Sequence, residues 1–200
     1  MTKGKGPKFI VPFKRRREGK TNYRKRLALV KSGLPRLVVR PSNRGVLVQI
    51  LEFHPKGDVV LAHAHSRELK KYGWVSKRNL PTAYLTGYLC ALRYLQGNKE
   101  KGTRFVLDIG FATPTRNNIT FSAMKGAVDA GLETNYDPEI ISDESRIRGE
   151  HIADYARKLK EEDEGKYKKM FSEFLSMNVQ PEDIPGLFDE VKNKIKGDVQ

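Results

Sequence analysis

The segment RLVVRPSNRGVLVQILEFHPKGDVVLAHA, residues 36–64, decides the fold because it contains three apolar, β-branched runs. The runs cover residues 36–40, 46–53 and 58–64, and short turn-forming segments at 42–45 and 55–57 separate them. Runs of this length, bounded by Gly, Pro, Asn and Ser, are typical of strands. We therefore predict an antiparallel three-strand meander. The second run is apolar on both alternating faces except at Gln49 and Glu52, which indicates a strand covered on both sides.

Downstream of the meander, helix and strand patterns alternate. Residues 80–96, LPTAYLTGYLCALRYLQ, carry one charge and end before Gly97, as expected of a core helix that is apolar nearly all round. RFVLDIG at 104–110 predicts a further strand, and a turn-rich stretch separates it from a helix at about 120–130. A meander followed by strand and helix units predicts an α/β fold, a layered domain with a mixed sheet and helices packed on it.

The last 68 residues differ in character, because they hold 17 acidic and 11 basic side chains. Three amphipathic helices are predicted there. They are marked by His151, Tyr155 and Leu159, by Tyr167, Met170, Phe171 and Phe174, and by Phe188, Val191 and Ile195 after Pro181. We therefore divide the chain into a basic N-terminal arm (1–20), an α/β core (21–132) and a helical C-terminal extension (133–200).

The first 45 residues carry the whole net charge of +14, since they hold 15 basic side chains and one acidic one, Glu18. A cationic block of this size neutralises a polyanion and releases its counterions. Phe9, Phe13 and Tyr23 lie among the cations, and aromatic rings in such a setting stack on bases. The charge pattern therefore predicts an RNA-binding protein.

Residues 1–20 have no periodicity, so we expect an arm that is ordered only against a partner. Thr21 is expected to cap a helix with Tyr23, Leu27 and Val30 on one face, and Gly33 is expected to end it. The opposite face carries Arg24, Lys25, Arg26 and Lys31 toward solvent or RNA. Arg36, Arg40 and Arg44 are expected to continue the phosphate-binding surface.

Several other classes of protein find little support. The single cysteine, Cys90, excludes a disulfide framework, and its apolar neighbours indicate a buried thiol. His63 and His65 lack a third ligand at a suitable spacing, so we read them as a polar strand end and predict no metal and no cofactor. No run approaches the ~20 apolar residues of a membrane span, and the start MTKGKGPK lacks a secretory signal. We expect a cytoplasmic protein with no membrane partner and no small-molecule substrate.

Two other functions remain open beside that of a structural RNA-binding protein. The predicted topology is similar to that of ribonuclease H-like nucleases, but a two-metal site needs several converging carboxylates. The first predicted strand has no acidic residue, the second has Glu52, and Asp108 lies on the later strand. Such scattered carboxylates do not build a two-metal site, and Asp108 is more simply a strand-end residue that bonds backbone. The other alternative is an RNA-binding chaperone, which would bind unstructured RNA as well as folded RNA.

Five stretches across the chain resemble the archaeal branch of the large-subunit ribosomal protein L-eighteen family, whose eukaryotic counterpart is ribosomal protein L-five. They are RRREGKTNYRKRL (15–27), VVRPSNRGVLVQI (38–50), LPTAYLTGYLCA (80–91), LDIGFATPTRNNITFSAMKGAVDAGL (107–132) and FSEFLSMNVQPEDI (171–184). The resemblance implies an α/β fold with a mixed sheet and no enzymatic activity. It also implies binding to 5S rRNA in the central protuberance of the large subunit, with large-subunit rRNA and neighbouring ribosomal proteins, including the other 5S rRNA-binding protein, as partners. Members usually carry glycine where this chain has Asn117 and Asn118, and Asn tolerates the left-handed conformation.

For such a role, the arm would thread between RNA helices, its cations would hold phosphates, and the hairpin turn would enter a second RNA surface. The residues expected to contact RNA are Lys8, Phe13, Lys14, Arg15, Arg16, Arg17, Lys20, Thr21, Asn22, Tyr23, Arg24, Lys25, Arg26, Arg40, Ser42, Asn43, Arg44, Arg116 and Asn117.

Overall fold

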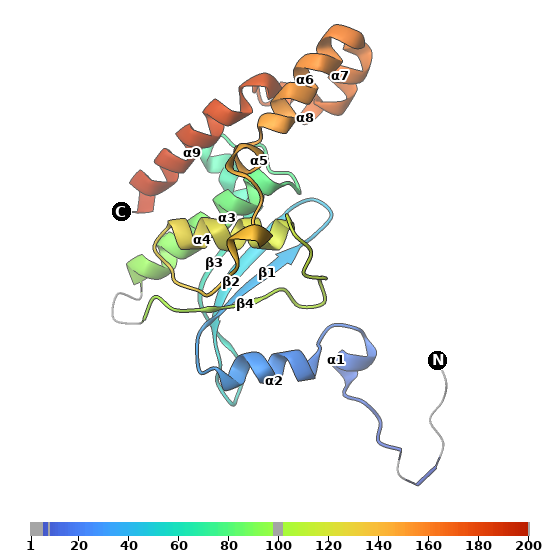
Figure 1. Cartoon of the computed structure of the whole chain (residues 1–200), viewed down its shortest axis with the longest axis vertical. Helices are drawn as coiled ribbons and strands as arrows, with labels where there is room; N and C mark the ends of the chain where they lie inside the picture. The colour runs from blue at the N-terminus through green and yellow to red at the C-terminus, as the bar shows by residue number, and fades with distance from the viewer. Residues whose placement is uncertain (1–5, 8, 98–101, 200) are drawn as a thin grey trace.

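The computed structural model describes residues 6, 7, 9–97 and 102–199, and in this part of the chain the predicted α/β architecture with a mixed sheet is present (Figure 1). Four strands form one sheet in the order β3-β2-β1-β4. The strands are β1 (Arg36–Pro41), β2 (Val46–Glu52), β3 (Val59–His65) and β4 (Val106–Asp108). The helices are α1 (Lys14–Arg17), α2 (Tyr23–Lys31), η1 (Ser66–Tyr72), α3 (Leu80–Gly97), α4 (Ile119–Asp129), η2 (Pro138–Ile140), α5 (Glu144–Arg148), α6 (Glu150–Glu162), α7 (Glu164–Met170), α8 (Ser172–Ser176), η3 (Pro181–Asp183) and α9 (Ile184–Val199).

The predicted meander is confirmed, because β1 pairs with β2 and β2 with β3, both antiparallel. β4 pairs parallel to β1, with Val38 opposite Asp108. β4 is shorter than the predicted run at 104–110. It ends at Asp108, whose carboxylate accepts a hydrogen bond of 2.8 Å from the backbone N–H of Gly110, and Gly110 adopts a φ of +64°. The interpretation of Asp108 as a strand-end residue that bonds backbone is therefore confirmed.

One face of the sheet packs on α3 and α4. Leu37, Val39, Val48 and Ile50 are buried on this face, where an apolar side chain is removed from water. α3 is a core helix, as predicted, and Cys90 in it is fully buried; burial raises the pKa of its thiol to about 12.

α3 and α4 cross at two glycines. A Cβ on Gly87 would lie 2.0 Å from the carbonyl oxygen of Ala123, and a Cβ on Gly126 would lie 2.1 Å from that of Tyr84. Neither glycine has a positive φ, so close backbone approach, rather than conformational freedom, requires glycine here.

The other face of the sheet is only partly covered, which corrects the prediction for β2. Its residues Val46, Val48 and Ile50 are buried, whereas Leu47 and Leu51 on the opposite face are half-buried. The prediction failed because large apolar residues also occur on the solvent-facing side of an antiparallel strand. α2 lies beyond one end of the strands (Figure 1), and the cavity beside it is lined by Val38 of β1, Leu51 of β2 and Leu107 of β4.

The C-terminal extension packs on α3 through α9. Phe188 of α9 lies 5.3 Å from the ring of Tyr84 and 6.2 Å from that of Trp74, measured between centroids. Phe188, Val191 and Ile195 are buried, as predicted. Buried side chains therefore run continuously from the sheet through α3 into α9.

Two predicted faces in the extension are wrong. In α6 the buried face is Ala153, Ala156 and Leu159, while Tyr155 is 47% exposed and His151 is exposed, because small alanines let η3 and α9 approach closely. The predicted second helix is two helices, α7 and α8, which break at Phe171. Its Tyr167, Phe171 and Phe174 are buried, but Met170 is exposed.

The molecule is elongated. In Figure 1, α1 and α2 lie at one end of the long axis, and α6, α7 and α8 form a lobe at the other end. None of the helices in the described ranges is both long and apolar enough to cross a bilayer.

Candidate nucleic-acid interface

The start of α2 is fixed by Asn22. Its side-chain oxygen accepts a hydrogen bond of 3.1 Å from the backbone N–H of Lys25, which satisfies a free donor of the first turn. The prediction that Thr21 is the cap is wrong, because its hydroxyl instead accepts a hydrogen bond of 2.8 Å from Nε of Arg15. The helix ends at Lys31, close to the predicted stop at Gly33. Gly33 itself adopts a φ of +69°.

The described part of the arm contains one turn of helix, α1, that the absence of periodicity did not predict. All four side chains of α1 are exposed. Phe13, just before α1, packs on Tyr23 at the start of α2 with a centroid distance of 5.1 Å. This ring contact connects the arm to α2.

α2 rests on the sheet through a polar contact rather than through its predicted apolar face. Leu27 is 58% exposed, and no residue of α2 is fully buried. Arg26 instead donates two hydrogen bonds of 2.8 Å to the carboxylate of Asp58, at the start of β3. Charge-assisted bidentate pairs of this kind are strong and directional, so this pair sets the orientation of α2.

Asp58 belongs to a chain of ion pairs that runs across the sheet. Arg36 donates to Asp58 at 2.5 Å and to Asp108 at 3.4 Å, and Arg40 donates to Asp108 at 2.8 Å. Burial raises the pKa of the Asp58 carboxyl, but the hydrogen bonds and charges of Arg26 and Arg36 outweigh it, and the pKa lies below its usual value. The hydrogen bond to Asp58 likewise raises the pKa of Arg26.

This chain of ion pairs corrects the prediction for Arg36. Its side chain is 2% exposed and serves the internal carboxylates, so it cannot extend the phosphate-binding surface. Arg26 and Arg40 also form ion pairs, but their side chains are 35% and 42% exposed to solvent. Both remain predicted RNA contacts.

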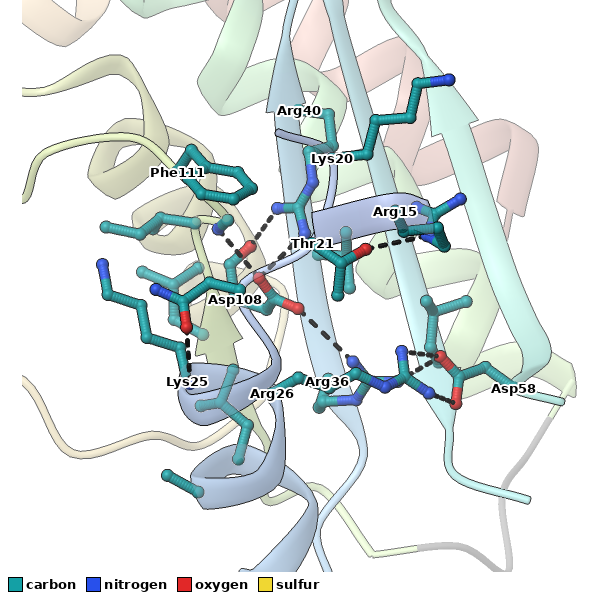
Figure 2. A pocket seen from close by; sticks show the side chains of 18 residues that line it. Arg15, Lys20, Thr21, Lys25, Arg26, Arg36, Arg40, Asp58, Asp108 and Phe111 are labelled. Atoms are coloured by element: carbon teal, nitrogen blue, oxygen red, sulfur yellow. Dashed lines mark hydrogen bonds and ion pairs between the residues drawn. The ribbon is translucent and has the colours of Figure 1, made fainter. Parts of the chain in front are cut away.

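A cavity of about 500 Å³ lies between the arm, α2 and the open face of the sheet (Figure 2). Its walls bring together Arg15, Lys20, Thr21, Asn22, Lys25, Arg26 and Arg40 of the predicted set. Segments that are far apart in the sequence also contribute, from Asp58 and from the turn 108–111 that follows β4. The cavity is within the size range of ligand sites in proteins.

The outer surface around the cavity carries cations without an internal partner. In the described ranges, no ion pair involves Lys14, Arg16, Arg17, Arg24 or Lys25, and all five side chains are exposed. Lys20 pairs with Glu18 at 2.9 Å on the surface, where such a pair contributes little. Lys8 of the predicted set lies outside the described residues.

The predicted hairpin contacts lie elsewhere. Ser42, Asn43 and Arg44 are exposed in the β1–β2 turn, which the 2.8 Å hydrogen bond from the N–H of Ser42 to the carbonyl of Gly45 closes. Arg44 lines a second cavity, of about 370 Å³, together with Arg67, Lys70 and Glu173. The hairpin therefore belongs to a separate basic surface next to the C-terminal extension.

Arg116 and Asn117 lie in the loop before α4. Arg116 pairs on the surface with Glu139 at 2.9 Å. Asn117 has a φ of +59°, so it adopts the left-handed conformation expected for this turn, and Asn118 caps α4. Neither residue lines either cavity.

Sequence reasoning missed Phe111, Arg67 and Lys70. Phe111 is 57% exposed although it lines the first cavity, and an aromatic residue directly after a strand-end glycine was the available signal. Arg67 and Lys70 lie in the short helix η1, and no local pattern distinguishes them from ordinary surface cations.

The carboxylates that face the first cavity do not form a metal site. Asp58 and Asp108 are both neutralised by arginine, and the described residues contain no group of three potential metal-ligating side chains. His65 instead accepts a hydrogen bond of 3.0 Å from the N–H of Arg67 and caps η1, which is a strand-end role. The fold and this surface define a basic α/β protein suited to binding a polyanion.

Comparison with known proteins identifies the family. Residues 7–104 match the family described as "Ribosomal large subunit proteins 60S L5, and 50S L18". The chain is 49% identical to the large ribosomal subunit protein uL18 of Thermofilum pendens over 197 residues, which cover 98% of this chain and 99% of that protein. It is 50% identical to the uL18 proteins of Aeropyrum pernix, covering 96% of this chain and 90% of that protein, and of Ignicoccus hospitalis, covering 97% and 94%.

The chain belongs to the uL18 family of large ribosomal subunit proteins. Membership makes it a structural constituent of the large ribosomal subunit and not an enzyme. The resemblance seen in the sequence is therefore confirmed, and the nuclease alternative is excluded.

Proposed function

We propose that the protein binds 5S rRNA and helps attach it to large-subunit rRNA in the central protuberance. The observation that carries this proposal is the group of exposed cations without internal partners on α1 and α2, beside a cavity of about 500 Å³. RNA duplexes are recognised through shape, phosphates and 2′-hydroxyls. An α/β core with a cationic arm at one end is suited to that mode of recognition.

The residues divide into three roles. Phosphates are held by the cations of the arm, Lys14, Arg15, Arg16, Arg17 and Lys20. Arg24 and Lys25 extend this surface along α2. Asn22 and Tyr23 add amide and stacking contacts. The second basic surface, with Arg44, lies away from α2 and contacts large-subunit rRNA. In this division, residues 1–20 form the binding arm and 21–132 the RNA-binding core. The extension 133–200 faces neighbouring ribosomal proteins, among them the other 5S rRNA-binding protein.

The test is a gel-shift competition at near-physiological salt. Labelled 5S rRNA is bound to the purified protein and challenged with excess tRNA and single-stranded RNA. We expect one protein per 5S rRNA and persistence of the complex. Equal displacement by every RNA would contradict the proposal and favour the chaperone alternative.

A triple variant, Arg15→Ala with Arg16→Ala and Arg17→Ala, tests the arm. Loss of three phosphate contacts should lower the dependence of log affinity on log salt by roughly 2 to 2.7 units, while the circular-dichroism spectrum stays unchanged because these side chains are exposed. The matched control removes three cations from the other end of the chain, Lys158→Ala, Lys168→Ala and Lys194→Ala. Equal losses in both variants would show a nonspecific charge effect and contradict the assigned role.

A further inference from the structure

The rim of the cavity beside α2 carries an aromatic ring that the fold does not use. Phe111 is 57% exposed, and Figure 2 shows its ring beside Arg40, across the cavity from the pair of Arg26 and Asp58. An apolar ring gains little from this position in the isolated protein, because more than half of its surface stays in water. Contacts of the preceding turn nevertheless fix the backbone that carries the ring.

The turn 108–111 holds Phe111 in place. The N–H of Gly110 donates to Asp108 at 2.8 Å, and Gly110 adopts a φ of +64°. A Cβ on Gly110 would lie 3.0 Å from Cζ of Arg40, so the guanidinium passes directly against this turn. Arg40 is itself held by Asp108. The backbone that carries the ring is therefore held by the ion pair of Arg40 with Asp108.

The remaining walls combine apolar and cationic groups. Val38 and Leu51 of the open sheet face and Leu29 of α2 contribute apolar surface, while Lys25 and Arg15 lie at the edge. Nδ2 of Asn22 has no partner among the described residues. The two carboxylates in the cavity are neutralised by arginine, so a phosphate that enters the cavity meets no uncompensated negative charge.

We propose that this cavity takes one unstacked RNA nucleotide, with its base stacked on Phe111 and its phosphate held by Lys25 and Arg15. A cavity of about 500 Å³ accommodates a ligand of this size. Unpaired bases are the usual targets of specific RNA recognition, and they stack on aromatic or guanidinium planes. The inference rests on the proposed function, since it specifies how the same surface selects its RNA.

The experiment compares the binding of 5S rRNA by the wild type, Phe111→Ala and Phe111→Trp, with Tyr155→Ala as the matched control on the distant lobe, where Tyr155 is 47% exposed. We expect Phe111→Ala to lose affinity by roughly 5- to 150-fold, the range produced by removal of one base–aromatic stack. The salt dependence should stay unchanged, because the ring holds no phosphate. Phe111→Trp should bind like the wild type, and so should Tyr155→Ala.

Chemical probing of base reactivity in the saturated complexes provides a readout that does not depend on affinity. We expect one unpaired base to be protected by the wild type and to regain reactivity with Phe111→Ala. Unchanged affinity, a loss accompanied by a weaker salt dependence, or identical reactivity patterns would overturn the inference. If the wild type selects 5S rRNA and Phe111→Ala binds equally well, only this inference fails. If the wild type does not select 5S rRNA, the proposed function itself fails.

Discussion

The carboxylate of Asp58 connects α2 to the sheet. It accepts hydrogen bonds from Arg26 of α2 and from Arg36, which is buried in β1. Removing one partner of a buried ion pair costs much more than the net contribution of the pair, because the remaining charge loses its compensation. The position of α2 therefore depends on Asp58, which together with Asp108 also compensates the charge of the buried Arg36.

We expect Asp58→Asn to lower the free energy of unfolding by about 2 to 3 kcal/mol, measured by urea titration. Asp154→Asn is the matched control, since it removes an exposed pair with Arg157 and should change stability by less than about 1 kcal/mol. Equal effects of the two variants would contradict the role assigned to Asp58.

The effect of Asp58 should depend on pH. Its pKa is lowered in the folded protein from the usual 3.8, so the carboxylate contributes its full stability above the unfolded-state pKa. This contribution is lost as the pH falls through the lower folded-state pKa. The difference between the wild type and Asp58→Asn should stay constant from neutral pH to about pH 5 and shrink below about pH 4.

Among the elements, α3 and α4 bring their backbones into close contact at Gly87 and Gly126. We expect Gly126→Ala to lower the free energy of unfolding by about 1 to 3 kcal/mol, because the new methyl group would overlap the carbonyl of Tyr84 and force the helices apart. The contact is to backbone, so no side-chain rotation relieves it.

Gly186→Ala in α9 is the control for this prediction, since a Cβ there meets nothing within 4 Å. It should be neutral or stabilise by up to about 1 kcal/mol through the higher helix propensity of alanine. If Gly126→Ala were as stable as this control in thermal unfolding, the interpretation of the crossing would be wrong.

Periodicity and turn chemistry predicted most elements. The meander, the core helix, α4 and the final helix follow from local patterns of apolar and turn residues. Local patterns did not predict the role of a side chain where contacts between residues far apart in the sequence determine it. Arg26 looked like one more surface cation, since nothing near it indicates a partner 32 residues away. The local pattern placed Tyr155 on the buried face of α6, but Ala153 and Ala156 are the residues that pack against the rest of the extension. In the candidate site, the arm cations could be predicted from charge, whereas Phe111 joins them only through the parallel pairing of β4 with β1.

On the scale of the whole molecule, the α/β core and the C-terminal extension share one continuous set of buried side chains. Lys192 of α9 also lies 5.2 Å from the ring centroid of Tyr84, a cation–π contact between the two parts. We expect a single calorimetric unfolding transition, with the calorimetric and van't Hoff enthalpies equal. Two separate transitions would show that the extension unfolds independently.

The ends of the molecule also differ in charge. The residues up to position 45 carry +14 and those from 133 onward carry −6, and α1 and α2 lie at the opposite end of the long axis from α6, α7 and α8. The protein is therefore a strong electric dipole. In the field of a large polyanion the protein would experience a torque before any contact forms, with its basic end turned toward the polyanion and its acidic end turned away. Productive encounters would thus be selected by rotation during approach, and salt that shortens the range of the field would slow capture as well as weaken it.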